Sequence, residues 1–352
     1  MGLRECGRND LLVREMGMSE RIGVIGAGSW GTTLANLLAK KGLEVTLWAY
    51  EAELVTAMGT RRENPLFLPG VTLAPGLSVT NELRDAVEGK ELILLASPSQ
   101  VMRGVVTQVA PFLRPGVTLV NASKGIELDT FMTIDQVCAT VLPPEVARRF
   151  CVLSGPSFAR EVALEMPTAV VAAAADLAVA TAVQRLFTTD YFRVYTNSDV
   201  VGVEIGGALK NVIAVAAGIS DGLGFGYNTR AALITRGLAE MTRLGAAMGA
   251  NSGTFAGLAG MGDLVLTCTG DLSRNRTVGV RLGKGELLAD ILGDMRMVAE
   301  GVKTAESAWR LARRVGVEMP ITEKVYQILH EDKPARQAVL ELMTRDLKAE
   351  RG

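Results

Sequence analysis

The most constraining feature of this chain is a glycine-rich turn between a short apolar strand and an apolar helix. Gly26, Gly28 and Gly31 form a G-x-G-x-x-G pattern, which follows residues 21–25 and opens a helix expected over residues 32–40. The first glycine permits a tight turn, the second lets the backbone approach a pyrophosphate, and the third lets helix and strand pack closely. The pyrophosphate would contact free N–H groups at the helix N-terminus. A turn without a ligand is disfavoured, because a second strand ending in an acid follows in the expected order.

That acid is Glu51, which lies after the expected strand 44–48 and 51 − 31 = 20 residues beyond the last glycine. An acidic residue at this distance is typical of a group that binds the hydroxyls of the cofactor ribose. The first 50 or so residues therefore predict a dinucleotide site.

Composition excludes several classes of protein. A chain of 352 residues is long enough for two domains, and a net charge of −1 gives no electrostatic reason to expect nucleic acid or anionic membrane as a partner. The four cysteines, Cys6, Cys138, Cys151 and Cys268, lack C-x-x-C spacing, so we expect neither a metal site nor a disulfide framework. A reducing cytoplasm is the simplest setting.

Two segments need separate interpretation. Residues 1–17 are too charged, and their apolar run is too short, for a signal peptide, so we expect residues 1–18 to be a disordered extension, with Met18 as a possible natural start. Residues 200–219 are the most apolar long stretch, but Glu204, Lys210 and Asn211 interrupt it. Charges are costly inside a bilayer, so a buried core helix is expected and a membrane span is not.

The pattern changes near residue 197. Before it, strand-like and helical runs alternate, which predicts an α/β domain over residues 19–197 with a Rossmann-like, doubly wound, mostly parallel sheet. After it, helical patterns predict an all-α domain over residues 198–352. The further expected strands are residues 91–96, 117–121, 151–153, 168–173 and 192–196, and the expected helices of the second domain are 199–219, 230–248, 254–258, 286–292, 303–315 and 322–329.

Polar turns follow two of the expected strands, at residues 97–100 and 121–125. Ligands of parallel sheets bind at the carboxyl ends of the strands, so these turns should face the same crevice as the glycine turn.

The chain has one histidine, His330, near the end of a C-terminal helix and beside Glu331 and Asp332. We interpret it as a solvated helix-end residue. The general acid of a dehydrogenase reaction would then be a lysine, whose pKa burial can lower.

Two lysines are candidates. Lys210 lies among small and apolar residues of a long helix, where burial disfavours its charged form; the alternative is a lysine that extends to solvent. Lys124 lies in a glycine-bearing loop after a strand, where a cation can meet a carbonyl or a phosphate, although a surface lysine is equally compatible with that position.

A third group of residues follows the run from Gly260 to Cys268. Ser273, Arg274, Asn275 and Arg276 combine guanidinium, hydroxyl and amide donors that suit a phosphate dianion. As an isolated string, they would more often be a basic loop.

Together these motifs resemble the bacterial NAD(P)-dependent glycerol-3-phosphate dehydrogenase family over about residues 21–345. The matching segments are GAGSWGTTLA from Gly26, ENPLFLPG from Glu63, NASKGIE from Asn121, SGPSFAREV from Ser154, the run GGALKNVIAVAAGISDGLGFGYNTRAALITRGLAEM from Gly206, GLAGMGDLVLTCTG from Gly257, SRNR from Ser273 and EGVKT from Glu300.

The resemblance implies a reversible hydride transfer between glycerol 3-phosphate and dihydroxyacetone phosphate, which supplies glycerol 3-phosphate for phospholipid synthesis in a cytoplasmic homodimer. It implies that Lys210 is the catalytic lysine and that Lys124 contacts substrate and cofactor, with Asp263 and Thr267 around the reacting oxygen. The implied substrate contacts are Lys124, Gly155, Ser157, Lys210, Asn211, Asp263, Ser273, Arg274 and Asn275. The implied cofactor contacts are Gly26, Gly28, Ser29, Trp30, Gly31, Tyr50, Glu51, Lys124, Ala159, Arg274, Val298 and Glu300.

One departure leaves NAD and NADP both open as cofactors. Many relatives have a basic residue directly after the second strand, whereas this chain has Tyr50 and Glu51. Glu51 would favour the free ribose of NAD if it points inward; otherwise Tyr50 can stack while Arg61 or Arg62 meets the phosphate of NADP. Two alternative functions are another β-hydroxyacid-type dehydrogenase, which would not explain Ser273 to Asn275, and a non-catalytic dinucleotide-binding module, which would not explain Lys124, Lys210 and Asp263.

Overall fold

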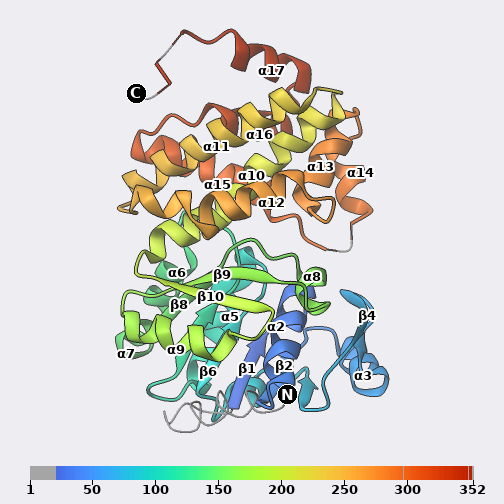
Figure 1. Ribbon diagram of the computed structural model, residues 1–352, viewed down its shortest axis with the longest axis vertical. Helices are drawn as coiled ribbons and strands as arrows, with labels where there is room; N and C mark the ends of the chain where they lie inside the picture. Colours follow the sequence, from blue (N-terminus) through green and yellow to red (C-terminus); the bar gives the residue numbers. More distant parts are fainter. Residues whose placement is uncertain (1–20, 296, 348, 351–352) are drawn as a thin grey trace, which may run out of the picture. The chain divides into compact units, whose positions relative to one another are not determined.

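The computed structural model describes residues 21–350 except 296 and 348, so the expectations for residues 1–18 lie outside the described residues. The chain forms two compact units (Figure 1). The first contains residues 21–123 and Ile134–Val200, and the second contains Lys124–Thr133 together with residues 201–350. The short segment 124–133 thus groups with the second unit although its flanking residues belong to the first.

An eight-stranded sheet forms the centre of the first unit, in the order β10-β9-β8-β7-β6-β1-β2-β5. All pairs are parallel except β8 with β9, so the expectation of a mostly parallel sheet is confirmed. The strands are β1 (Arg21–Ile25), β2 (Glu44–Trp48), β5 (Leu77–Thr80), β6 (Leu92–Leu95), β7 (Thr118–Asn121), β8 (Phe150–Ser154), β9 (Thr168–Ala173) and β10 (Phe192–Asn197), with a separate hairpin of β3 (Glu63–Asn64) and β4 (Leu68–Thr72).

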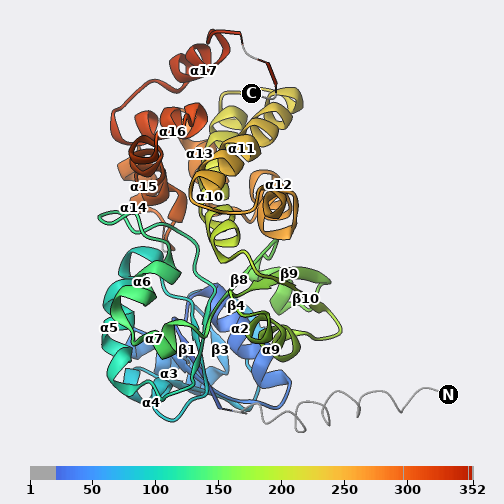
Figure 2. The same ribbon diagram turned by 90° about the vertical axis from the view of Figure 1, so that its left-hand side faces the viewer.

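Helices cover both faces of this sheet, which explains why its central strands are apolar on both sides. β6 and β7 are buried at every residue, as strands covered on both faces must be. Figure 2 shows α2 and α9 on one side of the sheet and α5 and α6 on the other. The helices of this unit are α2 (Ser29–Lys40), α3 (Ala52–Arg61), α4 (Leu83–Val87), α5 (Met102–Val109), α6 (Ile134–Val141), α7 (Pro144–Ala147), α8 (Ala159–Ala163) and α9 (Leu177–Phe187).

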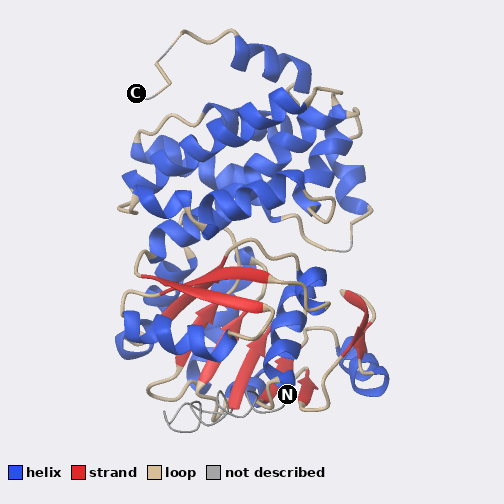
Figure 3. Ribbon diagram, in the orientation of Figure 1, coloured by secondary structure: helices blue, strands red, loops and turns tan. Residues whose placement is uncertain are grey.

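The described part of the second unit contains helices and no strands, as Figure 3 shows, so its all-α class is confirmed. The helices are α10 (Val200–Gly222), α11 (Tyr227–Ala247), α12 (Asp263–Thr269), α13 (Arg274–Gly283), α14 (Leu288–Gly293), α15 (Glu300–Val315), α16 (Pro320–His330) and α17 (Ala335–Met343). Two irregular turns, a 3₁₀ turn at Ser252–Ala256 and a π-helical turn at Leu258–Gly262, precede α12.

α10 is the central helix of this unit. By length and composition it is apolar enough to cross a membrane, and within the described residues it is the one helix that is. However, 89% of its most apolar window is buried inside the protein, as expected for a core helix. Its apolar residues are therefore accounted for by packing against α11, α12 and α15, whose buried side chains belong to the same core.

The sequence was wrong about one helix and missed three. The expected helix 254–258 is interrupted, because the chain changes from a 3₁₀ turn to a π-helical turn at Gly257. The helices that the sequence did not indicate are α12, α13 and α17.

Candidate active site

The glycine turn has the backbone geometry that a phosphate-binding turn requires. Gly26 has φ of +118°, and a Cβ at Gly31 would lie 1.9 Å from the Gly26 carbonyl oxygen. Gly28 precedes α2 and supplies no side-chain cap, and nothing lies within 4 Å of where its Cβ would be. The helix N-terminus thus offers uncapped N–H groups beside open space, which fits the pyrophosphate of a dinucleotide.

Asn64 supports this turn, a role that the sequence did not reveal. Its side-chain amide, fully buried, donates to the Ala27 carbonyl oxygen at 2.8 Å and to the Thr32 hydroxyl at 2.9 Å. Its carbonyl accepts from the Phe67 N–H at 2.9 Å. The only available signal was its place in the ENPLFLPG segment, since no local pattern links a residue to a turn 37 residues earlier.

The polar turns after β6 and β7 meet the glycine turn at the carboxyl edge of the sheet, as the sequence predicts. The Ser97 hydroxyl donates to the Ile25 carbonyl oxygen at 3.2 Å, and the Ser123 hydroxyl donates to the Ser97 carbonyl oxygen at 2.6 Å. Three successive strand ends are therefore joined across one edge.

The start of α8 lies beside the glycine turn. The Thr33 hydroxyl donates to the carbonyl oxygens of both Ser29 and Ala159, at 2.8 and 3.1 Å. Among the described residues, the buried Nε1 of Trp30 has no hydrogen-bond partner. An orphaned donor and an uncapped helix end in the same turn both fit a bound polar ligand.

The loop after β8 has its own constraint. Gly155 has φ of +136°, and a Cβ there would lie 2.9 Å from Cα of Val170. The Ser157 hydroxyl donates to the Gly155 carbonyl oxygen at 3.0 Å, which shapes the loop.

The residues after β2 bear on the choice between NAD and NADP as the cofactor. Tyr50 is 81% exposed, and Glu51 precedes α3 with an extended backbone. Arg62 donates to the carbonyl oxygen of Leu77 at 3.0 Å and also to that of Ala74. Because its guanidinium is bound to the backbone, Arg62 is a poor candidate for a 2′-phosphate, whereas Arg61 is exposed.

The predicted catalytic residues gather around one carboxylate in the second unit. Lys210 Nζ donates to Asp263 Oδ1 at 2.5 Å and to the Thr267 hydroxyl at 2.9 Å. Lys124 Nζ donates to the other oxygen, Asp263 Oδ2, at 2.6 Å. Lys210 and Asp263 are buried, with 8% and 1% of their surfaces exposed. One carboxylate thus holds two ammonium groups that are 210 − 124 = 86 positions apart in the sequence.

Burial sets the protonation of this cluster. It lowers the pKa of Lys210 to about 8, although the charge of Asp263 acts in the opposite direction. Burial alone would raise the pKa of Asp263, but the two ammonium groups hold that pKa below its usual value. Lys210 is therefore an amine that can gain and lose a proton near neutral pH beside a carboxylate that stays ionised.

A glycine on α10 makes the Lys210–Asp263 contact possible. Gly206 lies one turn before Lys210, on the same face of the helix. A Cβ at Gly206 would lie 2.6 Å from the Ala259 carbonyl oxygen, within the π-helical turn that leads into Asp263. The absent side chain lets this turn approach α10 closely enough for the carboxylate to reach Nζ. π-Helical turns often occur at functional sites.

The predicted phosphate-binding residues begin α13. The Ser273 hydroxyl is buried and accepts from the Arg276 N–H at 3.2 Å, so it caps the helix. Arg274 is exposed and donates to the Val298 carbonyl oxygen at 2.9 Å. Arg274 uses one guanidinium nitrogen on Val298, and its other N–H groups can meet a substrate phosphate. The Ser273 hydroxyl, in contrast, caps α13.

Two buried asparagines join three helices at this place. The Asn275 amide donates to Asn211 Oδ1, and its carbonyl accepts from the Gly301 N–H, both at 2.9 Å. These bonds connect the starts of α13 and α15 to the turn of α10 that carries Lys210. Val298 is half exposed just before α15, and Glu300 is the first residue of that helix.

The histidine and the cysteines of the described residues lie where a structural role is the simplest interpretation. His330 ends α16 and is exposed, with Nε2 3.3 Å from the Val302 carbonyl oxygen. Cys138, Cys151 and Cys268 are buried thiols that form no disulfide, and burial raises the pKa of both Cys151 and Cys268 to about 12. Within residues 21–350, these side chains lie outside the Lys210–Asp263–Lys124 cluster.

Comparison with known proteins agrees with this geometry. Residues 21–180 match the family of the NAD-dependent glycerol-3-phosphate dehydrogenase N-terminus, and residues 199–340 match that of its C-terminus. The chain is 82% identical over 334 residues to glycerol-3-phosphate dehydrogenase [NAD(P)+] of Geobacter sulfurreducens, covering 95% of this chain and all of the relative. It is 80% identical over 335 residues to the enzyme of the same name from Geobacter metallireducens, again 95% of this chain and all of the relative. The crystal structure of glycerol-3-phosphate dehydrogenase from Coxiella burnetii has 40% identity and a TM-score of 0.89, covering 93% of this chain and 99% of that one.

Proposed function

Because the chain belongs to the NAD-dependent glycerol-3-phosphate dehydrogenase family, it is an NAD(P)-dependent oxidoreductase that acts on a CH–OH group, and we propose that Lys210 is its general acid and base. The substrate is glycerol 3-phosphate, which is oxidised reversibly to dihydroxyacetone phosphate. The Lys210–Asp263–Lys124 cluster is the observation that carries the assignment of roles.

When bound, the nicotinamide accepts or supplies the hydride at C2 of the substrate. In the reduction, protonated Lys210 donates its proton to the C2 oxygen; in the oxidation, neutral Lys210 accepts the hydroxyl proton. A pKa near 8 keeps both forms accessible around neutral pH.

Asp263 and Thr267 orient the Lys210 amine, since both accept hydrogen bonds from it. Lys124 adds a second positive charge on the far oxygen of Asp263. A positive field near a developing oxyanion lowers the barrier to reaction.

We assign the substrate phosphate to Arg274, with Asn275 and Asn211 holding α13 in place. Arg274 is an exposed guanidinium at the first residue of a helix, where N–H groups also favour an anion. Binding the non-reacting phosphate here would orient C2 for the reaction.

For the dinucleotide, Gly26 to Gly31 would hold the pyrophosphate, and Glu51 would bind the adenine ribose. We expect NAD(H) to be used at least usefully, because Tyr50 and Glu51 follow β2 where a basic residue would favour NADP. Arg62 binds backbone carbonyls, which leaves the exposed Arg61 as the candidate for a 2′-phosphate. The values of kcat/KM for NADH and NADPH test this, and Glu51→Ala should lower the preference for NADH. Strict use of NADPH that is unchanged in Glu51→Ala would show that Glu51 does not bind the ribose.

The experiment that tests the whole proposal is turnover of dihydroxyacetone phosphate with NADH or NADPH. Binding of NADH without turnover would indicate a binding module. Turnover of an unphosphorylated hydroxy acid in preference to glycerol 3-phosphate would indicate another β-hydroxyacid-type dehydrogenase.

Four finer proposals concern the cellular setting of the enzyme. We expect a homodimer, located in the cytoplasm. We expect no membrane span, because α10 is packed inside the second unit. The product glycerol 3-phosphate would supply phospholipid synthesis. Light scattering of the purified protein measures the oligomeric state directly.

A further inference from the structure

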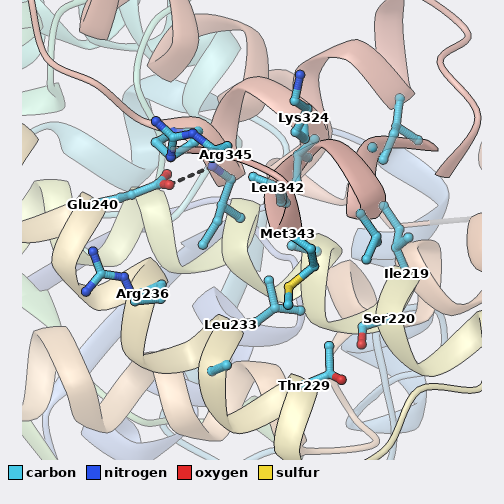
Figure 4. Close-up of a pocket in the computed structure, with 18 of the residues that line it drawn as sticks. Ile219, Ser220, Thr229, Leu233, Arg236, Glu240, Lys324, Leu342, Met343 and Arg345 are labelled. Atoms are coloured by element: carbon cyan, nitrogen blue, oxygen red, sulfur yellow. Dashed lines mark hydrogen bonds between the residues drawn. The ribbon is translucent and has the colours of Figure 1, made fainter. Parts of the chain in front are cut away.

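A cavity lies in the helical unit, formed by residues other than those of the Lys210–Asp263–Lys124 cluster. Its volume is about 600 Å³, within the range of about 300–1,000 Å³ that is usual for small-molecule sites. Helices α10, α11, α16 and α17 and the segment after α17 line it. Figure 4 shows labelled side chains from these helices around the cavity.

The cavity has an apolar middle and two different polar ends. Leu233, Leu342 and Met343 lie between the ends in Figure 4. On one side lie Arg236, Glu240 and Arg345, and on the opposite side lie Ser220 and Thr229. A ligand that fills the cavity must therefore be elongated and apolar in its middle.

The first end is cationic. Arg236, Arg243 and Arg345 line it, against two carboxylates, Glu240 and Glu318. Glu240 is already satisfied, because it accepts from the N–H groups of Ile321 and Thr322 and from the Thr322 hydroxyl. Burial also raises its pKa to about 7, so its charge is incomplete at neutral pH. The positive charge of the three arginines thus exceeds the negative charge of the two carboxylates, which favours an anionic group on the ligand.

The second end contains an unsatisfied polar atom. Ser220 is 1% exposed, and within the described residues its buried hydroxyl has no hydrogen-bond partner. A buried polar group without a partner is costly, and the side chain lines the cavity. A hydrogen-bonding group on a ligand would satisfy it.

α17 is held over the cavity by charge. Its Glu341 binds Lys324 of α16 at 2.5 Å and Lys333 at 2.6 Å. Apolar packing of α17 is limited, since Leu340 and Met343 are 62% and 78% exposed. Lys324 is thus engaged by the covering helix.

Arg236 donates to the Glu350 carbonyl oxygen, and Arg243 donates to the Glu318 carbonyl oxygen. Arg345 is paired with the Glu318 carboxylate at 3.5 Å. Backbone carbonyls do not neutralise a guanidinium charge, so this end keeps an excess of positive charge that an anionic group would offset.

We propose that this cavity binds an elongated amphiphilic anion, with its anionic group at the arginine end and a hydrogen-bonding group at Ser220. The site is additional to the dehydrogenase site and does not depend on the assignment of Lys210. Its ligand class is a medium-length chain with polar groups at both ends.

The test is calorimetric titration of the full-length protein with 12-hydroxydodecanoate, dodecanoate and dodecanol below their critical micelle concentrations. The hydroxy acid should bind saturably at one site per chain. Dodecanol, which lacks the anion, should bind about 10-fold more weakly or worse, and dodecanoate a few-fold more weakly. Ser220→Ala should remove the difference between the two acids.

Leu233→Trp is the blocking variant, because Leu233 is only partly buried and faces the cavity. It should weaken binding of the hydroxy acid at least 10-fold, whereas Leu287→Trp, at a 69% exposed leucine away from the cavity, should leave it unchanged. Equal binding of all three probes, or equal effects of both variants, would show non-specific adsorption and overturn the proposal. The absence of saturable binding by the hydroxy acid would overturn it as well. Dissociation of an oligomer in Leu233→Trp would then identify a second copy of the chain as the occupant.

Discussion

At the scale of single residues, the central observation is one carboxylate, that of Asp263, which forms ion pairs with two lysines. Asp263 accepts from Lys210 through one oxygen and from Lys124 through the other. Burial lowers the pKa of Lys210, so its amine can transfer a proton near neutral pH. Loss of this amine should therefore slow the chemical step more than it weakens cofactor binding.

Lys210→Met should therefore reduce kcat by about 10²–10⁴-fold, the range typical of general acid–base groups, with little change in the Kd of NADH. In the wild type, kcat/KM for the ketone should fall as the pH rises through about 8, because the acid form is lost, and kcat/KM for the alcohol should rise over the same range. Lys90→Met is the matched control, since Lys90 is equally buried, at 7% exposed, but lies in the first unit. Wild-type turnover in Lys210→Met, with chemistry limiting, would contradict the role.

Arg274→Ala should lower kcat/KM for dihydroxyacetone phosphate by about 10- to 150-fold, the equivalent of a charge-assisted hydrogen bond worth roughly 1.5–3 kcal/mol. Unphosphorylated dihydroxyacetone should lose far less. Arg281→Ala on the same helix, where the guanidinium binds Glu286 and Asp294, should leave both substrates unaffected. An equal loss for both ketones at constant NADH affinity would mean that Arg274 does not bind the phosphate.

At the scale of elements, the site depends on how closely α10 approaches the π-helical turn at Leu258–Gly262. Most strands and the long helices were predictable, because their apolar patterns are continuous. α12 and α13 were not, since neither has a run of apolar residues at helical spacing long enough to recognise; the N-cap Ser273 was the one local signal. The π-helical turn at Leu258–Gly262 leaves no signature in the sequence beyond its glycines.

Gly206→Ala tests the importance of that approach. A Cβ 2.6 Å from the Ala259 carbonyl oxygen forces a shift that costs about 1–3 kcal/mol, more than alanine gains in helix propensity. We expect a lower Tm and a lower kcat, because Asp263 moves away from Lys210. Gly104→Ala in α5 has open space around it and should raise stability by about 0.4–1 kcal/mol without affecting kcat. The idea fails if both variants behave alike.

At the scale of the whole molecule, the free energy of unfolding should depend on pH because of one buried carboxyl group, that of Glu240. Glu240 is 1% exposed and joins α11 to the start of α16 through two backbone N–H groups. Burial raises its pKa from 4.5 to about 7, so the folded protein binds more protons than the unfolded chain between these values. The free energy of unfolding should thus fall as the pH rises across this interval.

The expected loss is roughly 3 kcal/mol, from about 1.4 kcal/mol for each pH step. It is measured as the Tm of the wild type minus that of Glu240→Gln, which should decrease from pH 5 to pH 7.5. A difference that does not vary with pH would show that Glu240 titrates normally.

The sequence names the residues of the candidate site but not how they come together. Lys124, Lys210 and Asp263 were all identified as candidates, yet nothing local indicates that residues 124 and 263, which are 139 positions apart, share one ion pair. That contact lies within the helical unit, because Lys124–Thr133 groups with it while the flanking residues group with the sheet.

This discontinuity limits how members of the family can be recombined. A chimera with a single crossover near residue 200 takes Asp263 and Lys210 from one parent and Lys124 from the other, although all three belong to one unit. Exchange of segment 124–133 together with the C-terminal half would keep the three residues from a single parent. Selection on natural hybrids should accordingly tolerate two-segment exchanges better than a simple swap of halves.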